Sequence, residues 1–147
     1  MAPETAAHAR TKFRLARLIA EAIEAAHLPW EVFTDGMAVQ IDADTVYEPD
    51  ALVRCGPPIS DAAVTINDPV IVVEVLSPST RARDAGAKLA DYFRLPSVRH
   101  YLIVKTDTRA VIHHRRDDAG RIETRIIDNG RVNLDPPGVA LTGIFPA

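Results

Sequence analysis

One uninterrupted apolar run constrains the fold of this 147-residue chain more than any other feature. Residues 69–76 read PVIVVEVL, with β-branched side chains at most positions and a single charge, Glu74. Such a run is typical of a strand covered on both faces, because a strand with one solvated face alternates apolar and polar residues. We therefore expect a central strand of a layered sheet, with one carboxylate drawn into its interior.

The remaining patterns place two helices and several strands around this strand. Apolar residues at three- and four-residue spacing predict a helix over about residues 3–27, which Pro29 ends. Asp35-Gly36 predicts a tight hairpin between residues 30–34 and 37–41. The other expected elements are strands over 46–54 (with a strand end or bulge at Pro49), 99–105, 110–116 and 121–127, a loop over 55–67 and a helix over 83–95.

The order of these elements predicts one domain of mixed α+β type, that is, an α/β protein with a central sheet flanked by helices. The single cysteine, Cys55, cannot form an internal disulfide, which suits a reducing cytoplasm. No apolar run approaches the roughly 20 residues of a membrane span, so we expect a cytoplasmic protein without a membrane partner. The net charge of −3 argues against a strongly basic nucleic-acid binder and leaves room for a local basic patch only.

Carboxylates are the first candidates for chemistry. Glu74 on a central strand must be paired, protonated or bound to a metal, because an unpaired buried charge is costly. Asp50 follows a proline 24 residues earlier, and two carboxylates on neighbouring strand ends can hold a hard divalent cation. Asp84, Lys88 and Tyr92 share one face of the second predicted helix. Each residue alone also has an ordinary structural interpretation, as a paired glutamate, a turn-forming aspartate or a solvated Asp–Lys pair.

Other reactive residue types give weaker signals. His113 and His114 are adjacent on a predicted exposed strand and point to opposite faces, which makes them a poor metal pair. The sequence holds no phosphate-binding glycine loop, no zinc-ligand spacing and no nucleophile elbow. The candidate site is therefore the one around Asp50 and Glu74.

Three strings carry a family resemblance: Tyr47-Glu48-Pro49-Asp50, then Glu74-Val75-Leu76-Ser77-Pro78-Ser79-Thr80, then Asp84, Lys88 and Tyr92. Together they resemble the Uma-two family of restriction-endonuclease-like proteins, within the PD-(D/E)XK nuclease superfamily. The resemblance implies a restriction-endonuclease-like mixed sheet and a metal-dependent endonuclease that hydrolyses phosphodiester bonds in DNA. Asp50 and Glu74 would bind Mg²⁺ or Mn²⁺.

The lysine of the superfamily motif is displaced in this chain. It normally follows the second acidic residue by two positions, where this sequence has Leu76. The resemblance assigns its role to Lys88 on the following helix, where a long stem can carry the ammonium group back to the strand end. Ser77, Tyr92 and Asp84 would support the site from behind.

The resemblance also bears on the N-terminus and on partners. Members usually carry a longer segment ahead of the first helix, so we expect a domain shortened at its N-terminus, with His8 where members have a histidine. The candidates for nucleic-acid contact are Arg81, Arg83, Lys12, Arg14 and Arg17. The family analogy allows a homodimer.

Two alternative functions stay open at this point. The acidic balance and the short N-terminus favour a catalytically inactive module that keeps the nuclease fold and binds nucleic acid or self-associates. Nuclease chemistry on RNA or on a modified nucleic acid is a further alternative, because an acidic metal site recognises the phosphate rather than the sugar.

Overall fold

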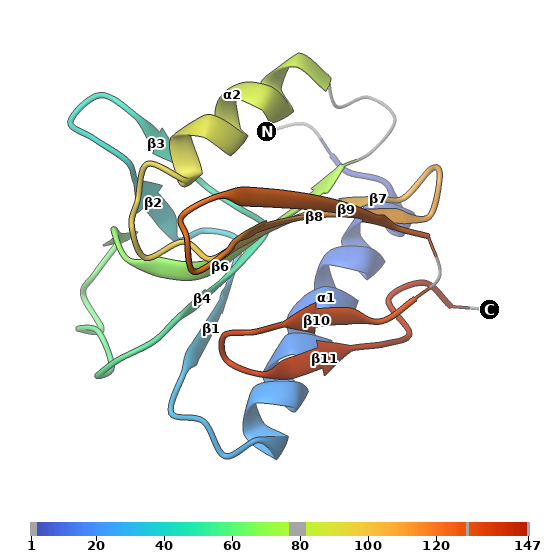
Figure 1. Ribbon diagram of the computed structural model, residues 1–147, viewed down its shortest axis with the longest axis horizontal. Coiled ribbons are helices and arrows are strands. Elements are labelled where there is room, and N and C mark those ends of the chain that lie inside the picture. The colour runs from blue at the N-terminus through green and yellow to red at the C-terminus, as the bar shows by residue number, and fades with distance from the viewer. Residues whose placement is uncertain (1–2, 77–81, 129, 147) are drawn as a thin grey trace.

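A six-stranded mixed sheet forms the centre of the fold (Figure 1). The computed structural model describes residues 3–76, 82–128 and 130–146, and for residues 82–85 the backbone alone. In the order β1-β4-β6-β7-β8-β9, only β6 and β7 run parallel. The strands are β1 (Glu31–Thr34), β4 (Ala51–Arg54), β6 (Pro69–Leu76), β7 (His100–Lys105), β8 (Ala110–Arg116) and β9 (Ile122–Ile127). The predicted class, a central mixed sheet flanked by helices, is confirmed.

Strand β6 occupies the position that its sequence predicts. It lies between β4 and β7, and every residue from Pro69 to Val75 is buried. Its odd-numbered side chains from Ile71 to Val75 pack on one face of the sheet, whereas Val72 belongs to the core on the other face. The alternation therefore turns Glu74 toward the same face as Val72.

Helix α1 (Ala6–Ala25) covers the face of the sheet to which Ile71, Val73 and Val75 point (Figure 1). The Thr5 hydroxyl accepts a hydrogen bond from the His8 N–H and caps its N-terminus. The predicted apolar stripe is confirmed, since Leu15, Ile19 and Ile23 are buried against the sheet. A hairpin of β10 (Val132–Leu134) and β11 (Val139–Leu141), which the sequence did not predict, packs beside α1.

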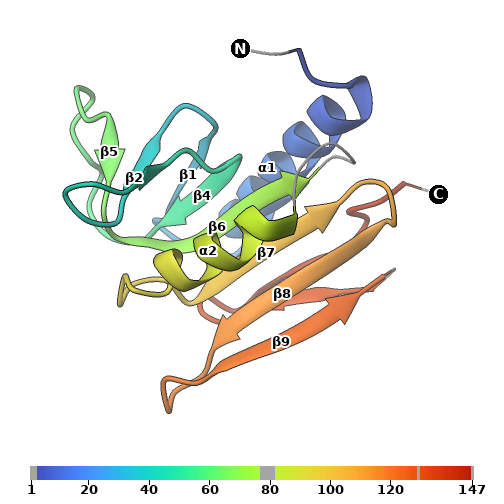
Figure 2. The ribbon, with the colours of Figure 1, turned by 90° about the horizontal axis from the view of Figure 1, so that it is seen from above.

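Helix α2 (Ala82–Tyr92) lies over β6 and β7 on the opposite face (Figure 2). Beside it, β3 (Val46–Tyr47), β2 (Ala38–Gln40) and β5 (Thr65–Ile66) form a separate three-stranded sheet. The second core, between these elements and the central sheet, contains Val39, Val72 and Tyr92. None of the helices within the described residues is long and apolar enough to cross a lipid bilayer.

Three sequence predictions need correction. The strands on either side of Asp35-Gly36 do not form a hairpin, because β1 pairs with β4 in the central sheet and β2 joins the small sheet. The predicted strand over 46–54 is interrupted at residues 48–50, so the proline does mark a strand end. His113 and His114 point to opposite faces as predicted, but both are buried rather than exposed.

Candidate active site

Asp50 is held against the end of β6, directly beside Glu74. Its backbone N–H donates to the Val73 carbonyl at 3.0 Å, and its carboxylate Oδ2 accepts from the Val75 N–H at 2.6 Å. Strand β4 begins only at Ala51, which pairs with Val73. The Val75 N–H therefore has no backbone partner on the β4 side, and the Asp50 carboxylate accepts its hydrogen bond instead. The aspartate thus contacts the residues immediately before and after Glu74.

Glu74 lies almost entirely inside the second core, with 8% of its side chain exposed. Its Oε1 accepts a hydrogen bond from the Tyr92 hydroxyl at 3.0 Å and lies 3.4 Å from the Lys88 ammonium. Lys88 and Tyr92 are four residues apart on α2, and the helix therefore presents both donors to one oxygen. The Lys88 ammonium also lies 5.5 Å from the centre of the Tyr47 ring.

Both carboxylates have a raised pKa. Burial is the main cause for each of them, and the negative charge of Asp50 adds to the rise at Glu74. The Val75 N–H and the positive charge of Lys12 act in the opposite direction on the pKa of Asp50, as Lys88 does on that of Glu74. The two acids are thus close enough to repel each other, and the nearby cations do not fully compensate for their burial.

The bonding of the two carboxylates suits a hard cation. Within the described residues, the hydrogen bonds to these groups reach Oδ2 of Asp50 and Oε1 of Glu74, and none reaches Oδ1 or Oε2. The described part of the chain holds no cluster of three or more histidine, cysteine and acidic residues that could bind a metal. Two carboxylates completed by water or phosphate oxygens are nevertheless a common environment for Mg²⁺. The donor set therefore fits magnesium or manganese and does not resemble a zinc site.

The N-terminal part of α1 completes the surroundings of Asp50. His8 Nε2 lies 2.7 Å from the Val75 carbonyl oxygen, while its Nδ1 lies 2.7 Å from Glu4 Oε2. Side chains from two distant segments thus hold both polar groups of the Val75 peptide backbone, Asp50 on the N–H and His8 on the carbonyl. The resemblance pointed to His8, whereas the role of the Val75 backbone has no signal in the sequence.

A pocket of about 260 Å³ opens beside Asp50. Lys12 stands in it and pairs with Glu4 at 2.9 Å and with Asp35 at 2.8 Å. Phe13 forms part of its wall and is 70% exposed. The pocket connects the half-buried Asp50 with solvent, so a ligand can reach this aspartate from the α1 side of the sheet.

The structure brings some predicted site residues together and leaves others elsewhere. Lys88 and Tyr92 contact Glu74, and Lys12 shares a pocket with Asp50. Arg17 instead pairs with Glu21 on the exposed side of α1. Ser77 and Arg81 lie outside the described residues, as do the side chains of Arg83 and Asp84.

Arg14 lies in a second, basic pocket of about 200 Å³. Arg10 and Arg109 line it as well, together with Thr106 at the end of β7. The Thr106 N–H donates to the Leu76 carbonyl at 3.3 Å, so this pocket lies beside the C-terminal ends of β6 and β7. Arg109 belongs to the turn between β7 and β8, and no sequence pattern had marked it as a functional residue.

The raised pKa values predict how stability depends on pH. The folded protein keeps these two protons to a higher pH than the unfolded chain does. Their contribution is fully present below the ordinary carboxylate range near pH 4 and is lost as pH rises through the raised folded values. Metal-free wild type should therefore lose stability relative to Glu74→Gln as the pH rises above about 4. Urea unfolding at several pH values measures this, and parallel curves for the two proteins would contradict it.

Comparison with known proteins identifies relatives over most of the chain. An uncharacterised protein of Synechocystis sp. (strain PCC 6803), slr1290, is 32% identical over 112 residues, covering 75% of this chain and 59% of the relative. Another from the same organism, sll1609, is 26% identical over 119 residues, covering 79% of this chain and 66% of the relative. The chain thus spans about six-tenths of the length of these curated relatives.

A solved structure and a family model complete the comparison. The crystal structure described as "a putative nuclease belonging to DUF820" from Anabaena variabilis ATCC 29413 matches with a TM-score of 0.74 at 14% identity, covering 92% of this chain and 75% of that chain. This match shows that the two proteins share a fold. The model of the Uma2 family, described as "Putative restriction endonuclease", matches residues 1–143. The chain therefore belongs to the Uma2 family, as its sequence motifs predicted.

Proposed function

We propose that this protein is a metal-dependent endonuclease that hydrolyses phosphodiester bonds in DNA. The carrying observation is the pair of carboxylates at the end of β6, Glu74 buried and Asp50 half-buried, each with one oxygen fixed by the protein and a raised pKa. Membership of the Uma2 family supports nuclease chemistry for this chain. Asp50 and Glu74 would hold Mg²⁺ or Mn²⁺ through their other oxygens.

Each residue of the site has a separate task in this proposal. A bound divalent cation would supply Lewis acidity toward the phosphate and an activated water. Asp50, fixed on the Val75 N–H, and Glu74, fixed by Tyr92, keep their carboxylates in place without an energetic cost at the moment of reaction. Lys88 lies 3.4 Å from Glu74 and can turn its ammonium group toward an attacking water or the scissile phosphate.

The basic pocket at the same end of β6 supports DNA as the substrate. Arg10, Arg14 and Arg109 line it, and guanidinium groups bind phosphate oxygens in a bidentate manner. A backbone that passed Asp50 could rest its neighbouring phosphates there. A local patch of this kind reconciles nucleic-acid binding with a net charge of −3.

The proposal is tested with purified protein, supercoiled plasmid and a metal titration. Mg²⁺ or Mn²⁺ should produce nicked plasmid, and calorimetry should detect Mn²⁺ binding to wild type. A parallel assay on single-stranded and duplex RNA decides between the two nucleic acids. Protein that neither binds Mn²⁺ nor cleaves at high concentration would contradict the proposal and leave the inactive, nucleic-acid-binding module as the better account.

Arg14 provides a prediction about DNA binding that does not depend on cleavage. Replacing Arg14 by glutamine should weaken binding to a short duplex about equally for all sequences, because a phosphate contact carries no base information. The slope of log affinity against log salt should fall by about one unit. Arg17→Gln, on the exposed side of the same helix, is the matched control and should bind as wild type does. Equal salt slopes for Arg14→Gln and wild type would remove the basic pocket from the DNA path.

A further inference from the structure

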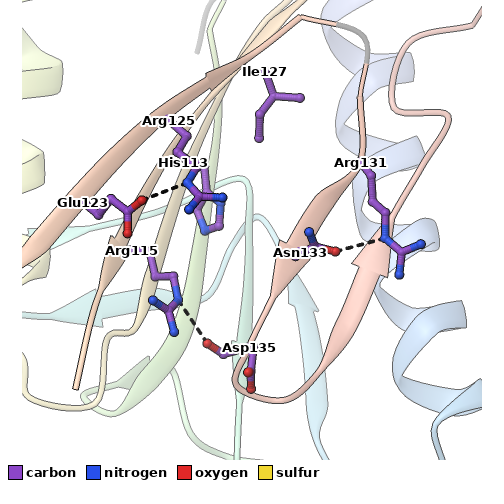
Figure 3. A pocket seen from close by; sticks show the side chains of 8 residues that line it. All are labelled: His113, Arg115, Glu123, Arg125, Ile127, Arg131, Asn133 and Asp135. Atoms are coloured by element: carbon purple, nitrogen blue, oxygen red, sulfur yellow. Dashed lines mark hydrogen bonds and ion pairs between the residues drawn. The ribbon is translucent and has the colours of Figure 1, made fainter.

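A third pocket, of about 210 Å³, lies between the β8–β9 hairpin and β10 (Figure 3). Its lining includes Arg115, Arg125, Arg131 and His113, and we refer to it as the arginine pocket. On β8, the side chains of His113 and Arg115 point to the same face as Val111, which belongs to the core on the α1 face. Arg125 on β9 is paired with His113 and points to that face as well. The arginine pocket therefore opens on the face opposite Glu74, and it shares no lining residue with the pocket beside Asp50.

The three arginines of this pocket are anchored in a common way. Arg125 Nε donates to Glu123 at 2.9 Å, Arg131 Nε to Asn133 Oδ1 at 3.0 Å, and Arg115 Nε to the Asp135 backbone carbonyl at 3.3 Å. Within the described residues, no hydrogen bond is made by a terminal guanidinium nitrogen of these three arginines. Figure 3 shows Arg115 and Arg125 on one wall and Arg131 on the other. Each arginine is thus held through its Nε–H and keeps the donors on its two terminal nitrogens available.

The charge inside the pocket favours an anion. Three guanidinium groups line it against the two carboxylates of Glu123 and Asp135, which leaves one positive charge in excess. Guanidinium groups match the oxygens of phosphate better than any other side chain does. The volume is smaller than the roughly 300 Å³ at which sites for drug-sized molecules begin, so the pocket suits a phosphate group with at most a small substituent.

A buried histidine pair gives the pocket a further property. His100 Nε2 lies 2.8 Å from the Pro136 carbonyl, which can only accept, so this nitrogen carries the proton. In the neutral ring Nδ1 of His100 then accepts from His113 Nε2, 2.9 Å away. The remaining nitrogen, His113 Nδ1, is consequently an acceptor, and within the described residues it makes no hydrogen bond. His113 is 5% exposed and lines the pocket, so the ring that carries this unpartnered acceptor forms part of the pocket wall.

Burial, together with the charged groups around the histidines, keeps both rings neutral at physiological pH. Burial lowers the pKa of His113 to about 4, and the positive charges of Arg115 and Arg125 act in the same direction. His114 from the same strand adds to this lowering, whereas Glu123 opposes it. Burial likewise lowers the pKa of His100 to about 4, with further lowering by His113. A ligand of this pocket must therefore offer negative oxygens to the arginines and a hydrogen-bond donor to His113.

We propose that the arginine pocket binds a phosphate group that carries one proton, as hydrogen phosphate or as a phosphate monoester. Its charged oxygens contact Arg115, Arg125 and Arg131, and its hydroxyl donates to His113 Nδ1. A DNA phosphodiester has no such hydroxyl, and neither has sulfate at neutral pH. The pocket is thereby a site for a small phosphorylated molecule rather than a second part of the DNA path.

Calorimetric titration with inorganic phosphate and with sulfate tests this inference without any cleavage assay. Inorganic phosphate keeps at least one proton throughout the neutral pH range, so it should bind about tenfold more tightly than sulfate, because sulfate leaves the His113 acceptor unmet. A phosphate monoester such as methyl phosphate loses its last proton at about pH 6, so its binding should weaken as the pH is raised above that value. Equal affinity for the two anions would overturn the role of His113, and the absence of phosphate binding would overturn the site. So would displacement of phosphate by a short DNA duplex that lacks terminal phosphates.

Two variants with opposite expected effects separate binding from structure. Arg125→Gln should weaken phosphate binding by about tenfold, while Glu123→Gln should strengthen it several-fold because it removes a negative charge from the wall. The Arg125 and Glu123 side chains are 68% and 47% exposed, so both variants should fold. Arg121→Gln, which removes an arginine of the same hairpin outside the pocket lining, is the control and should match wild type. Unchanged affinity in Arg125→Gln and Glu123→Gln would contradict the inference.

Discussion

Replacing Glu74 by glutamine is expected to lower metal-dependent DNA cleavage by at least about 100-fold, since several kcal/mol of transition-state stabilisation depend on the cation. Glutamine keeps the shape of the side chain, and its amide oxygen can still accept the hydrogen bond from Tyr92. The change removes a buried charge whose pKa burial raises. The variant should therefore be at least as stable as metal-free wild type near neutral pH, so a loss of activity will not reflect unfolding.

Asp50→Asn should give the same loss of cleavage by a different route. The asparagine carbonyl can keep the contact with the Val75 N–H, so the junction between β4 and β6 stays closed. What is lost is the negative charge that the cation requires. Plasmid nicking in Mg²⁺ and in Mn²⁺ measures both variants, with Glu24→Gln on the exposed side of α1 as the control. Variants that nick as fast as wild type would place the chemistry elsewhere in the protein.

The sequence predicts the structural surroundings of Glu74 well where a local pattern coincides with the three-dimensional contact. A continuous β-branched run can only be satisfied between two layers, so the position of β6 follows from its composition. A glutamate within that run is necessarily buried and needs partners. Four-residue spacing on a helix places Lys88 and Tyr92 on one face, and the contact of both with Glu74 bears out that expectation.

The sequence fails where the choice of partner is decided over a long distance. Asp35-Gly36 is a good turn, and the backbone at Gly36 has the positive φ of 108° that such turns use. The strands on either side nevertheless separate, because β4 offers β1 a four-residue antiparallel partner and the core on the α2 face takes up Val39 from β2. Turn chemistry alone did not determine which strands pair.

The same limit applies to the side-chain contacts that the sequence did not reveal. The contact of His8 with the Val75 carbonyl joins residues 67 positions apart, and the His100–His113 pair depends on the register between β7 and β8. The hairpin of β10 and β11 has only three residues in each strand, too few for a periodic signal. Without that hairpin the arginine pocket would lack one of its walls.

Tyr92 links the stability of the fold to the charge of the site, and two substitutions separate these contributions. Its side chain is fully buried, with ring centroids 5.4 Å from Tyr47 and 5.0 Å from Tyr101. Tyr92→Ala should lower the free energy of unfolding by about 3–5 kcal/mol, as truncation of a buried aromatic ring does. A domain of this size has only about 5–15 kcal/mol in total, so this variant will be close to unfolding.

Tyr92→Phe keeps the ring and removes only the hydroxyl that donates to Glu74 Oε1. The loss of a hydrogen bond to a buried charge should lower the free energy of unfolding by about 1.5–3 kcal/mol when Glu74 is ionised, and by less when it is protonated at low pH. Urea unfolding at a pH where Glu74 is ionised, and again at a low pH where it is protonated, measures the difference. Tyr101→Phe is the matched control, because that hydroxyl makes no hydrogen bond to Glu74 within the described structure. If Tyr92→Phe loses the same stability at both pH values, the hydroxyl does not stabilise the Glu74 charge. Lys88 would then be the group that stabilises the ionised form of Glu74, which metal binding requires.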